Sequence, residues 1–259
     1  MAGSLKSTSE GSTLVLTLSN PETKNTLSPE IYAAGIEALN AAENNPEIRS
    51  VVITGEGSMF CAGGNLQRLQ ANRREAPEVQ AESIEGLHNW IDSIRTYPKP
   101  VLAAVEGAAA GAGFSLALAC DFVVAASNAV FVMSYVNVAL SPDGGGSWGL
   151  ARALPRALAN ELLMLGERIG AERLRDLGLV NRVCAPGEAL ATSLRLADQL
   201  NTRAPNALAS IKELVNDAAI NSLSSQLASE RDHFVRNLHH ANGAEGMEAF
   251  LQKRPPQYR

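Results

Sequence analysis

Two short turns made of small residues are the first parts of this sequence that could support chemistry. They are Ala62-Gly63-Gly64 and Gly111-Ala112-Gly113, and each lies between an apolar segment and a helical pattern. The first backbone N–H groups of a helix have no partner inside it, and residues without bulky side chains let a ligand approach them. Two such N–H groups converging on one oxygen would form an oxyanion hole. Tight packing of helix on strand would also explain the glycines, and the sequence leaves both interpretations open.

Asp143 is the acidic residue that could act beside these turns, and it precedes three glycines, Gly144 to Gly146. An aspartate there could simply cap the helix that follows. Three glycines make a poor helix start, however, and they suit a wall against which a ligand lies. In an apolar pocket the carboxyl pKa would be raised, so that Asp143 could transfer protons near neutral pH.

Ser147 offers a different chemistry, because Gly145-Gly146-Ser147-Trp148-Gly149 fits the G-x-S-x-G pattern of a nucleophile elbow. A serine hydrolase would also need an acid and a histidine later in the chain, for which Asp198 and His233 are available. An elbow requires a strand that runs directly into the serine, whereas Pro142 and the glycines intervene here. We therefore rank this reading behind the one based on Asp143.

Composition excludes several other classes of function. The chain has 259 residues, a formal net charge of −5 and 46% hydrophobic residues, so no basic surface for nucleic acid or membrane is indicated. The three cysteines are widely spaced and the four histidines form no metal-binding pattern, which predicts reduced thiols and no metal site. With neither a signal peptide nor a membrane span recognisable, we expect a cytoplasmic protein.

The elements around the two turns predict an α/β fold with buried, parallel strands. Apolar strands are expected at Thr13–Leu18, Ser50–Thr54 and Val101–Val105, and a helix capped by Ser28 at residues 29–44. We expect a mobile loop at Asn72–Glu82 and an amphipathic helix at Ile84–Thr96. Beyond Pro186 the pattern is helical throughout, so residues 1–200 are predicted to form the core and residues 201–259 a helical C-terminal region. The expected C-terminal helices are Ala189–Leu200, Ala207–Ala219, Leu223–Leu238 and Gly246–Lys253.

Four motifs together resemble the crotonase superfamily of enoyl-CoA hydratases and isomerases. They are FCAGGNL, VEGAAAGAGFSLALACD, VALSPDGGGSWGLAR and ERIGAERLRDLGLVNRV, and the resemblance covers nearly the whole chain. It implies a superhelix of repeated ββα units, a C-terminal helical region used for trimerisation, and an acyl-CoA thioester as substrate. A homotrimer or a dimer of trimers is then expected, without a cofactor beyond the coenzyme A of the substrate.

The resemblance also implies roles for individual residues. The oxyanion hole would be the backbone N–H groups of Gly64 and Ala112. Coenzyme A contacts map near four residues of the N-terminal part and one basic residue near the C-terminus, namely Lys24, Ala62, Asn65, Leu66 and Lys253. Gln67 stands where a lysine facing coenzyme A is common, which moves the expected phosphate contacts to Arg68 or to Arg73 and Arg74.

This sequence departs from the hydratases of the family at the residues that handle water. Hydratases carry two glutamates, and the matching positions here hold Ser115 and Tyr135, which we expect to shape the acyl pocket. The acid is at Asp143 instead, as in the isomerase branch, which includes the ring-epoxide isomerases of phenylacetate breakdown. We therefore expect an isomerase that shifts a double bond through an enolate, with Asp143 as acid and base. The alternatives are a hydratase, a hydrolase or dehalogenase with Asp143 as nucleophile, and a non-catalytic scaffold that binds CoA esters.

Overall fold

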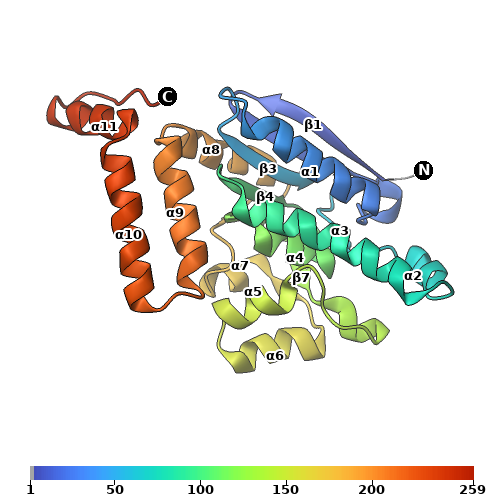
Figure 1. The fold of residues 1–259 in the computed structure, drawn as a ribbon. Coiled ribbons are helices and arrows are strands. Elements are labelled where there is room, and N and C mark those ends of the chain that lie inside the picture. The colour runs from blue at the N-terminus through green and yellow to red at the C-terminus, as the bar shows by residue number, and fades with distance from the viewer. Residues whose placement is uncertain (1–2) are drawn as a thin grey trace.

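The computed structural model describes residues 3–259, which form two sheets surrounded by helices (Figure 1). The large sheet has the strand order β1-β2-β3-β4-β6-β9, and its strands are parallel except that β1 pairs antiparallel with β2. Its strands are β1 (Ser4–Glu10), β2 (Thr13–Ser19), β3 (Ser50–Gly55), β4 (Val101–Val105), β6 (Phe122–Ala126) and β9 (Arg182–Cys184). The small sheet consists of β5 (Ala108–Ala110), β7 (Val130–Val132) and β8 (Ile169–Gly170).

Helices cover both faces of the large sheet, with α8 on one face and α1, α3 and α4 on the other. The described helices are α1 (Pro29–Glu43), α2 (Leu66–Asn72), α3 (Pro77–Thr96), α4 (Ala112–Ala119), α5 (Gly146–Ala153), α6 (Arg156–Leu165), α7 (Ala171–Asp176), α8 (Ala189–Asn201), α9 (Pro205–Ala218), α10 (Leu223–Leu238) and α11 (Ala241–Leu251). Two short 3₁₀ helices, η1 (Pro21–Thr23) and η2 (Ser134–Val138), complete the described elements.

The alternation of side chains along the strands divides the core in two. Val51 and Ile53 of β3 belong to the main cluster, which also contains residues of α1, α3 and α4. Val52, between them, points to the opposite face and joins a smaller cluster with Leu196 and Ala197 of α8. Successive side chains of a strand face opposite sides, so a strand covered on both faces is apolar at every position, as the SVVIT segment is.

The α/β class and most predicted elements agree with the structure. The segment after residue 72 differs from the prediction, because α3 begins at Pro77 and includes residues that we expected in a mobile loop. Pro77 occupies the first turn of the helix, where its missing N–H costs nothing, and Leu87, Trp90, Ile91 and Ile94 supply the buried face. The exposed antiparallel strand β1 was also not predicted, since its residues lack an apolar face.

The C-terminal helices α9, α10 and α11 project from the body as an arm (Figure 1). Lys212 of α9 ties the arm to the sheet, because its ammonium group lies 2.8 Å from Asp121 Oδ2 and also donates to the carbonyl of Ile94. The same Asp121 oxygen accepts a hydrogen bond from the backbone N–H of Val101, at the start of β4. Among residues 3–259 no helix has the length and apolar character needed to cross a membrane.

Candidate active site

The two small-residue turns lie side by side because the segment before the first one pairs with β5. Cys61 forms a parallel bridge with Ala109, in which Cys61 N–H donates to Ala108 and Ala110 N–H donates to Cys61. Each turn follows directly on this bridge. The two turns therefore lie next to each other although about fifty residues separate them in the sequence.

Glycine is required where the turns touch. Gly63 has a φ of +84°, and a Cβ atom there would lie 2.5 Å from the carbonyl oxygen of Ala110 and 3.1 Å from the backbone nitrogen of Ala112. A Cβ at Gly113 would lie 2.5 Å from the carbonyl oxygen of Cys61. The glycines that could have served packing alone thus also bring the backbone of one turn against the other.

The backbone N–H groups of Gly64 and Ala112 have no hydrogen-bond acceptor among the described residues. Ala112 is the first residue of α4, whose N-terminal end adds a partial positive charge. Both residues line one cavity of about 470 Å³. This pair of free donors fits an oxyanion hole.

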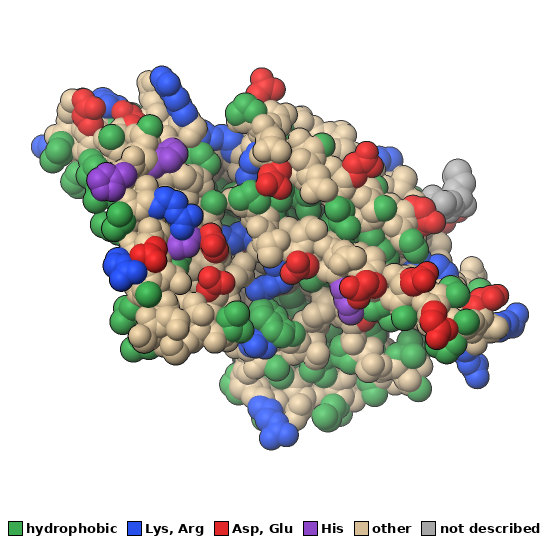
Figure 2. Space-filling view, viewed as in Figure 1, with side chains coloured by type: hydrophobic (Ala, Val, Ile, Leu, Met, Phe, Trp, Pro, Cys, Tyr) green, Lys and Arg blue, Asp and Glu red, His purple; other side chains and the backbone are tan. Residues whose placement is uncertain are grey.

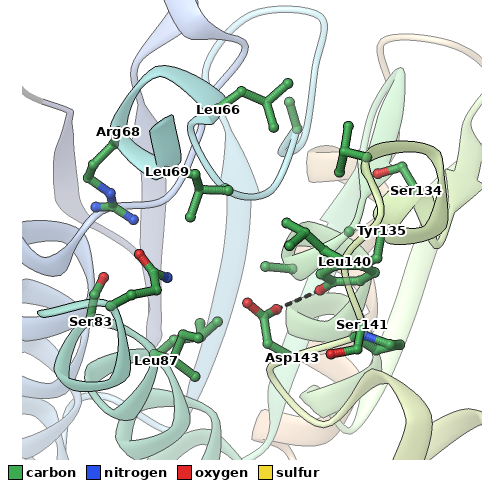
Figure 3. Close-up of a pocket in the computed structure, with 18 of the residues that line it drawn as sticks. Leu66, Arg68, Leu69, Ser83, Leu87, Ser134, Tyr135, Leu140, Ser141 and Asp143 are labelled. Atoms are coloured by element: carbon green, nitrogen blue, oxygen red, sulfur yellow. Dashed lines mark hydrogen bonds between the residues drawn. The ribbon is translucent and has the colours of Figure 1, made fainter. Parts of the chain in front are cut away.

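Asp143 lines the same cavity, and its carboxylate points into it (Figure 3). The hydroxyl of Tyr135 donates a hydrogen bond of 2.6 Å to Asp143 Oδ1, which leaves Oδ2 available. Burial raises the pKa of Asp143, and the bond from Tyr135 and the nearby His88 oppose that rise. Burial and the neighbouring Asp143 also raise the pKa of Tyr135, so its phenol stays protonated and remains a donor.

The glycines after Asp143 hold its backbone in place. Gly144 and Gly145 have φ values of +57° and +79°, and a Cβ at Gly146 would lie 2.7 Å from Ser115 Oγ. Ser115 in turn donates a hydrogen bond of 2.9 Å to the carbonyl oxygen of Asp143. Ser115, which we expected to shape or hydrogen-bond the acyl pocket, is 1% exposed and does not line the cavity; its hydrogen bond instead fixes the loop that carries Asp143.

The residues that the resemblance assigned to coenzyme A are only partly brought together. Ala62 and Leu66 line the cavity, and Leu66 is exposed at its rim. The side chain of Asn65 does not line it, because its Oδ1 caps α2 by accepting from the N–H groups of Gln67 and Arg68.

The two lysines with expected coenzyme A contacts lie outside the cavity wall. Lys24 is an exposed residue in the left-handed conformation, and its carbonyl oxygen accepts from Ala62 N–H, so its backbone supports the first turn. Lys253 follows α11, at the opposite end of the molecule from α2, and does not reach the cavity of its own chain (Figure 1).

Ser147 does not have the surroundings of a nucleophile. It is an exposed residue in the first turn of α5, follows a glycine turn rather than a strand, and does not line the cavity. His233 and Asp198 lie on α10 and α8, and the histidine packs near Glu213. The serine hydrolase alternative therefore has no site in this structure.

Several cavity residues come from helices whose role the sequence did not reveal. Tyr32 of α1, Arg68 of α2, and Ser83 and His88 of α3 all line the cavity. Because we expected a mobile loop at Asn72–Glu82, the sequence did not predict that α3 extends to Pro77 and that Ser83 lines the cavity. Arg68, one of the alternatives expected for the coenzyme A phosphates, has its side chain on the cavity wall (Figure 3).

Comparison with known proteins identifies the family of the chain. The family described as enoyl-CoA hydratase/isomerase matches residues 8–259. The chain belongs to this family. It is accordingly an enzyme with the crotonase fold, an α/β core followed by C-terminal helices, and the family acts on acyl-CoA.

Individual relatives of this family member differ in their reactions. The chain is 37% identical to 1,2-epoxyphenylacetyl-CoA isomerase of Escherichia coli K12, over 96% of this chain and 95% of the relative. It is 36% identical to carnitinyl-CoA dehydratase of Escherichia coli O157:H7, over 99% and 98% of the two chains. A crystal structure of an enoyl-CoA hydratase from Polaromonas sp. JS666 is 82% identical, with a TM-score of 0.98 and coverage of 98% and 99%.

Proposed function

We propose that the protein isomerises an unsaturated acyl-CoA by moving a double bond, with Asp143 as the acid–base group. The observation that carries this proposal is the position of the Asp143 carboxylate on the wall of the same cavity as the free N–H groups of Gly64 and Ala112. In this mechanism the thioester oxygen lies between the two N–H groups. They stabilise the negative charge that develops on this oxygen, and one such donor is typically worth roughly 3–4 kcal/mol.

Asp143 then removes a proton from C2 or C4 and returns it at the other carbon. Its raised pKa makes the carboxylate a stronger base than an exposed aspartate, which suits proton removal from carbon. Tyr135 holds Oδ1, so that Oδ2 is the oxygen that carries the proton. One acid–base group is enough for this shift, whereas hydration requires that water be both activated and protonated.

Hydration is the second candidate, and the 82% identical enoyl-CoA hydratase structure favours it. The two positions that hold glutamates in family hydratases do not support hydration here. Ser115 is buried behind Asp143, and Tyr135 donates its hydrogen bond to the Asp143 carboxylate. A hydratase here would need His88, which also lines the cavity, as the second group.

Incubation of the protein with 3-enoyl-CoA and 2-enoyl-CoA esters in deuterium oxide tests the proposal. Isomerisation gives a 2-enoyl-CoA that has the absorbance of a conjugated thioester and no added water in its mass. A gain of one water would support the hydratase, release of free coenzyme A would support a hydrolase, and binding without turnover would support a scaffold. Any of these three results, without double-bond migration, would overturn the proposal that the protein is an isomerase.

The oligomer that we propose is a homotrimer or a dimer of trimers, formed through the arm of residues 201–259. Exposed apolar side chains of the arm support this, among them Phe234, Phe250 and Leu251, the last two more than three-quarters exposed. Figure 2 shows hydrophobic side chains along the arm. Light scattering after size exclusion should give three or six copies, and a monomer would refute the proposal. We also propose that the protein acts in the cytoplasm on a free acyl-CoA, without nucleic acid, membrane or metal.

A further inference from the structure

Arg68 is a cation on the cavity wall that the proposed reaction does not use. Its Nε and Nη1 atoms are buried and have no hydrogen-bond partner among residues 3–259, although the guanidinium lies beside the phenol of Tyr32. No carboxylate of the described chain lies within 4 Å of it. A buried polar group without a partner is costly, so an arginine in this state points to a ligand that supplies the missing acceptor.

The surroundings of Arg68 are polar as well. Tyr32, Gln80 and Ser83 line the cavity with it; burial raises the pKa of the Tyr32 phenol, and the neighbouring Arg68 opposes that rise. Asn72 donates to Gln80 Oε1, which leaves the amide N–H groups of Gln80 free to donate. The guanidinium of Arg68, the hydroxyls of Tyr32 and Ser83 and the amide of Gln80 can therefore all donate at this end of the cavity.

The position of Arg68 relative to Asp143 indicates which part of a bound acyl chain Arg68 would contact. In Figure 3 Arg68 and Ser83 lie on one side of the Asp143 carboxylate, and Ser134 and Tyr135 lie on the other. Leu69 and Leu87 supply apolar wall between Arg68 and Asp143. An acyl chain whose thioester lies at Gly64 and Ala112 would thus pass an apolar stretch and end among donors.

We propose that Arg68 binds a carboxylate at the far end of the acyl chain, so that the substrates are CoA monoesters of dicarboxylic acids. The planar guanidinium matches a carboxylate through two parallel hydrogen bonds, and Ser83 and Gln80 offer further donors to the same group. A plain alkyl chain would leave the buried Nε and Nη1 atoms of Arg68 without an acceptor. The inference rests on the proposed placement of the thioester, and it adds the chemical class of the acyl group.

Binding of saturated CoA esters tests this inference separately from the isomerase reaction, because saturated esters do not react. Calorimetry would compare succinyl-, glutaryl- and adipoyl-CoA with butyryl-, pentanoyl- and hexanoyl-CoA, and with free coenzyme A. For the dicarboxylic series the best chain length should bind at least about tenfold more tightly than its neutral counterpart, as expected for one charge-assisted hydrogen-bonded pair.

The variant Arg68→Met should remove this preference by weakening binding of the dicarboxylic ester about 10- to 100-fold. Neutral esters and free coenzyme A should bind it nearly as well as they bind the wild type, which also shows that the variant is folded. Arg68→Lys should retain part of the preference, and Arg156→Met, at an exposed arginine of α6 that does not line the cavity, should retain all of it.

Two results would overturn the proposal. One is a wild type that prefers the neutral ester at every chain length. The other is an Arg68→Met variant that loses affinity equally for free coenzyme A, because Arg68 would then bind the phosphates. Neither result would affect the isomerase proposal, which depends on turnover of unsaturated esters.

Discussion

The hydrogen bond from Tyr135 to Asp143 should set the pH at which the enzyme becomes active. Replacing Tyr135 with phenylalanine removes a 2.6 Å bond to a carboxylate that burial already destabilises. A hydrogen bond to a charged group contributes about 1.5–3 kcal/mol, and one pKa unit corresponds to about 1.4 kcal/mol. We therefore expect the pKa of Asp143 to rise by about one to two further units in Tyr135→Phe.

The direction of the effect on activity follows from the role of the carboxylate as a base. Only the ionised form removes a proton, so activity falls as the pH falls through the pKa of Asp143. The acidic limb of kcat/KM against pH reports this pKa in the free enzyme. In Tyr135→Phe the limb should move to higher pH by about one to two units, with activity recovering on its alkaline side.

The assay is the rate of 3-enoyl-CoA isomerisation between acidic and alkaline pH, followed by absorbance of the conjugated product. Tyr97→Phe is the matched control, because it removes a buried 3.0 Å bond to the carbonyl of Leu39 without touching the cavity. An acidic limb that stays in place in Tyr135→Phe would refute the reasoning. A limb that moves equally in Tyr97→Phe would refute it as well.

Two further substitutions probe the backbone of the site and the attachment of the arm. Gly63→Ala forces a Cβ against the Ala112 nitrogen and should lower kcat by about 10²–10³-fold. Gly149→Ala is the control, because a Cβ there has no neighbour closer than 3.7 Å, and it should leave kcat unchanged. Equal kcat values for the two variants would contradict the role of the first turn. Lys212→Met leaves Asp121 buried without its cation and should lower the free energy of unfolding by about 3 kcal/mol at neutral pH, measured by denaturant titration. Burial raises the pKa of Asp121, so acidification protonates this carboxyl in the folded state. The difference in unfolding free energy between the wild type and the variant should therefore shrink as the pH falls. A difference that grows on acidification would contradict the pairing of Lys212 with Asp121.

The parts of the fold and of the site that could be predicted are those that a short, continuous stretch of sequence specifies. The strands were recognisable because buried parallel strands are apolar at every position, as in Val101–Val105. The two turns were recognisable because both are made of small residues, and a Cβ atom at Gly63 or Gly113 would lie 2.5 Å from a backbone oxygen. Their convergence on one cavity was not visible in the local pattern, since it depends on the bridge between Cys61 and Ala109.

The far wall of the cavity could not be predicted, because its side chains come from three separate helices. The polar residues at 72–82 indicated a solvated loop, yet Pro77 starts a helix there and Ser83 faces the cavity. Ser115 had a plausible place in the pocket, but its hydroxyl turns to the backbone of Asp143. Which face of a short helix is buried depends on the partner it packs against, and a single sequence does not contain that information.

The most direct test of the central claim is the rate at which Asp143→Asn moves the double bond of a 3-enoyl-CoA. The amide keeps the size of the side chain but cannot take a proton from carbon, so we expect binding of the ester to persist and turnover to be lost. Asp176→Asn, on an exposed aspartate of α7, should keep the wild-type rate. An Asp143→Asn variant that isomerises the ester at an undiminished rate would contradict the assignment of Asp143 as the acid–base group.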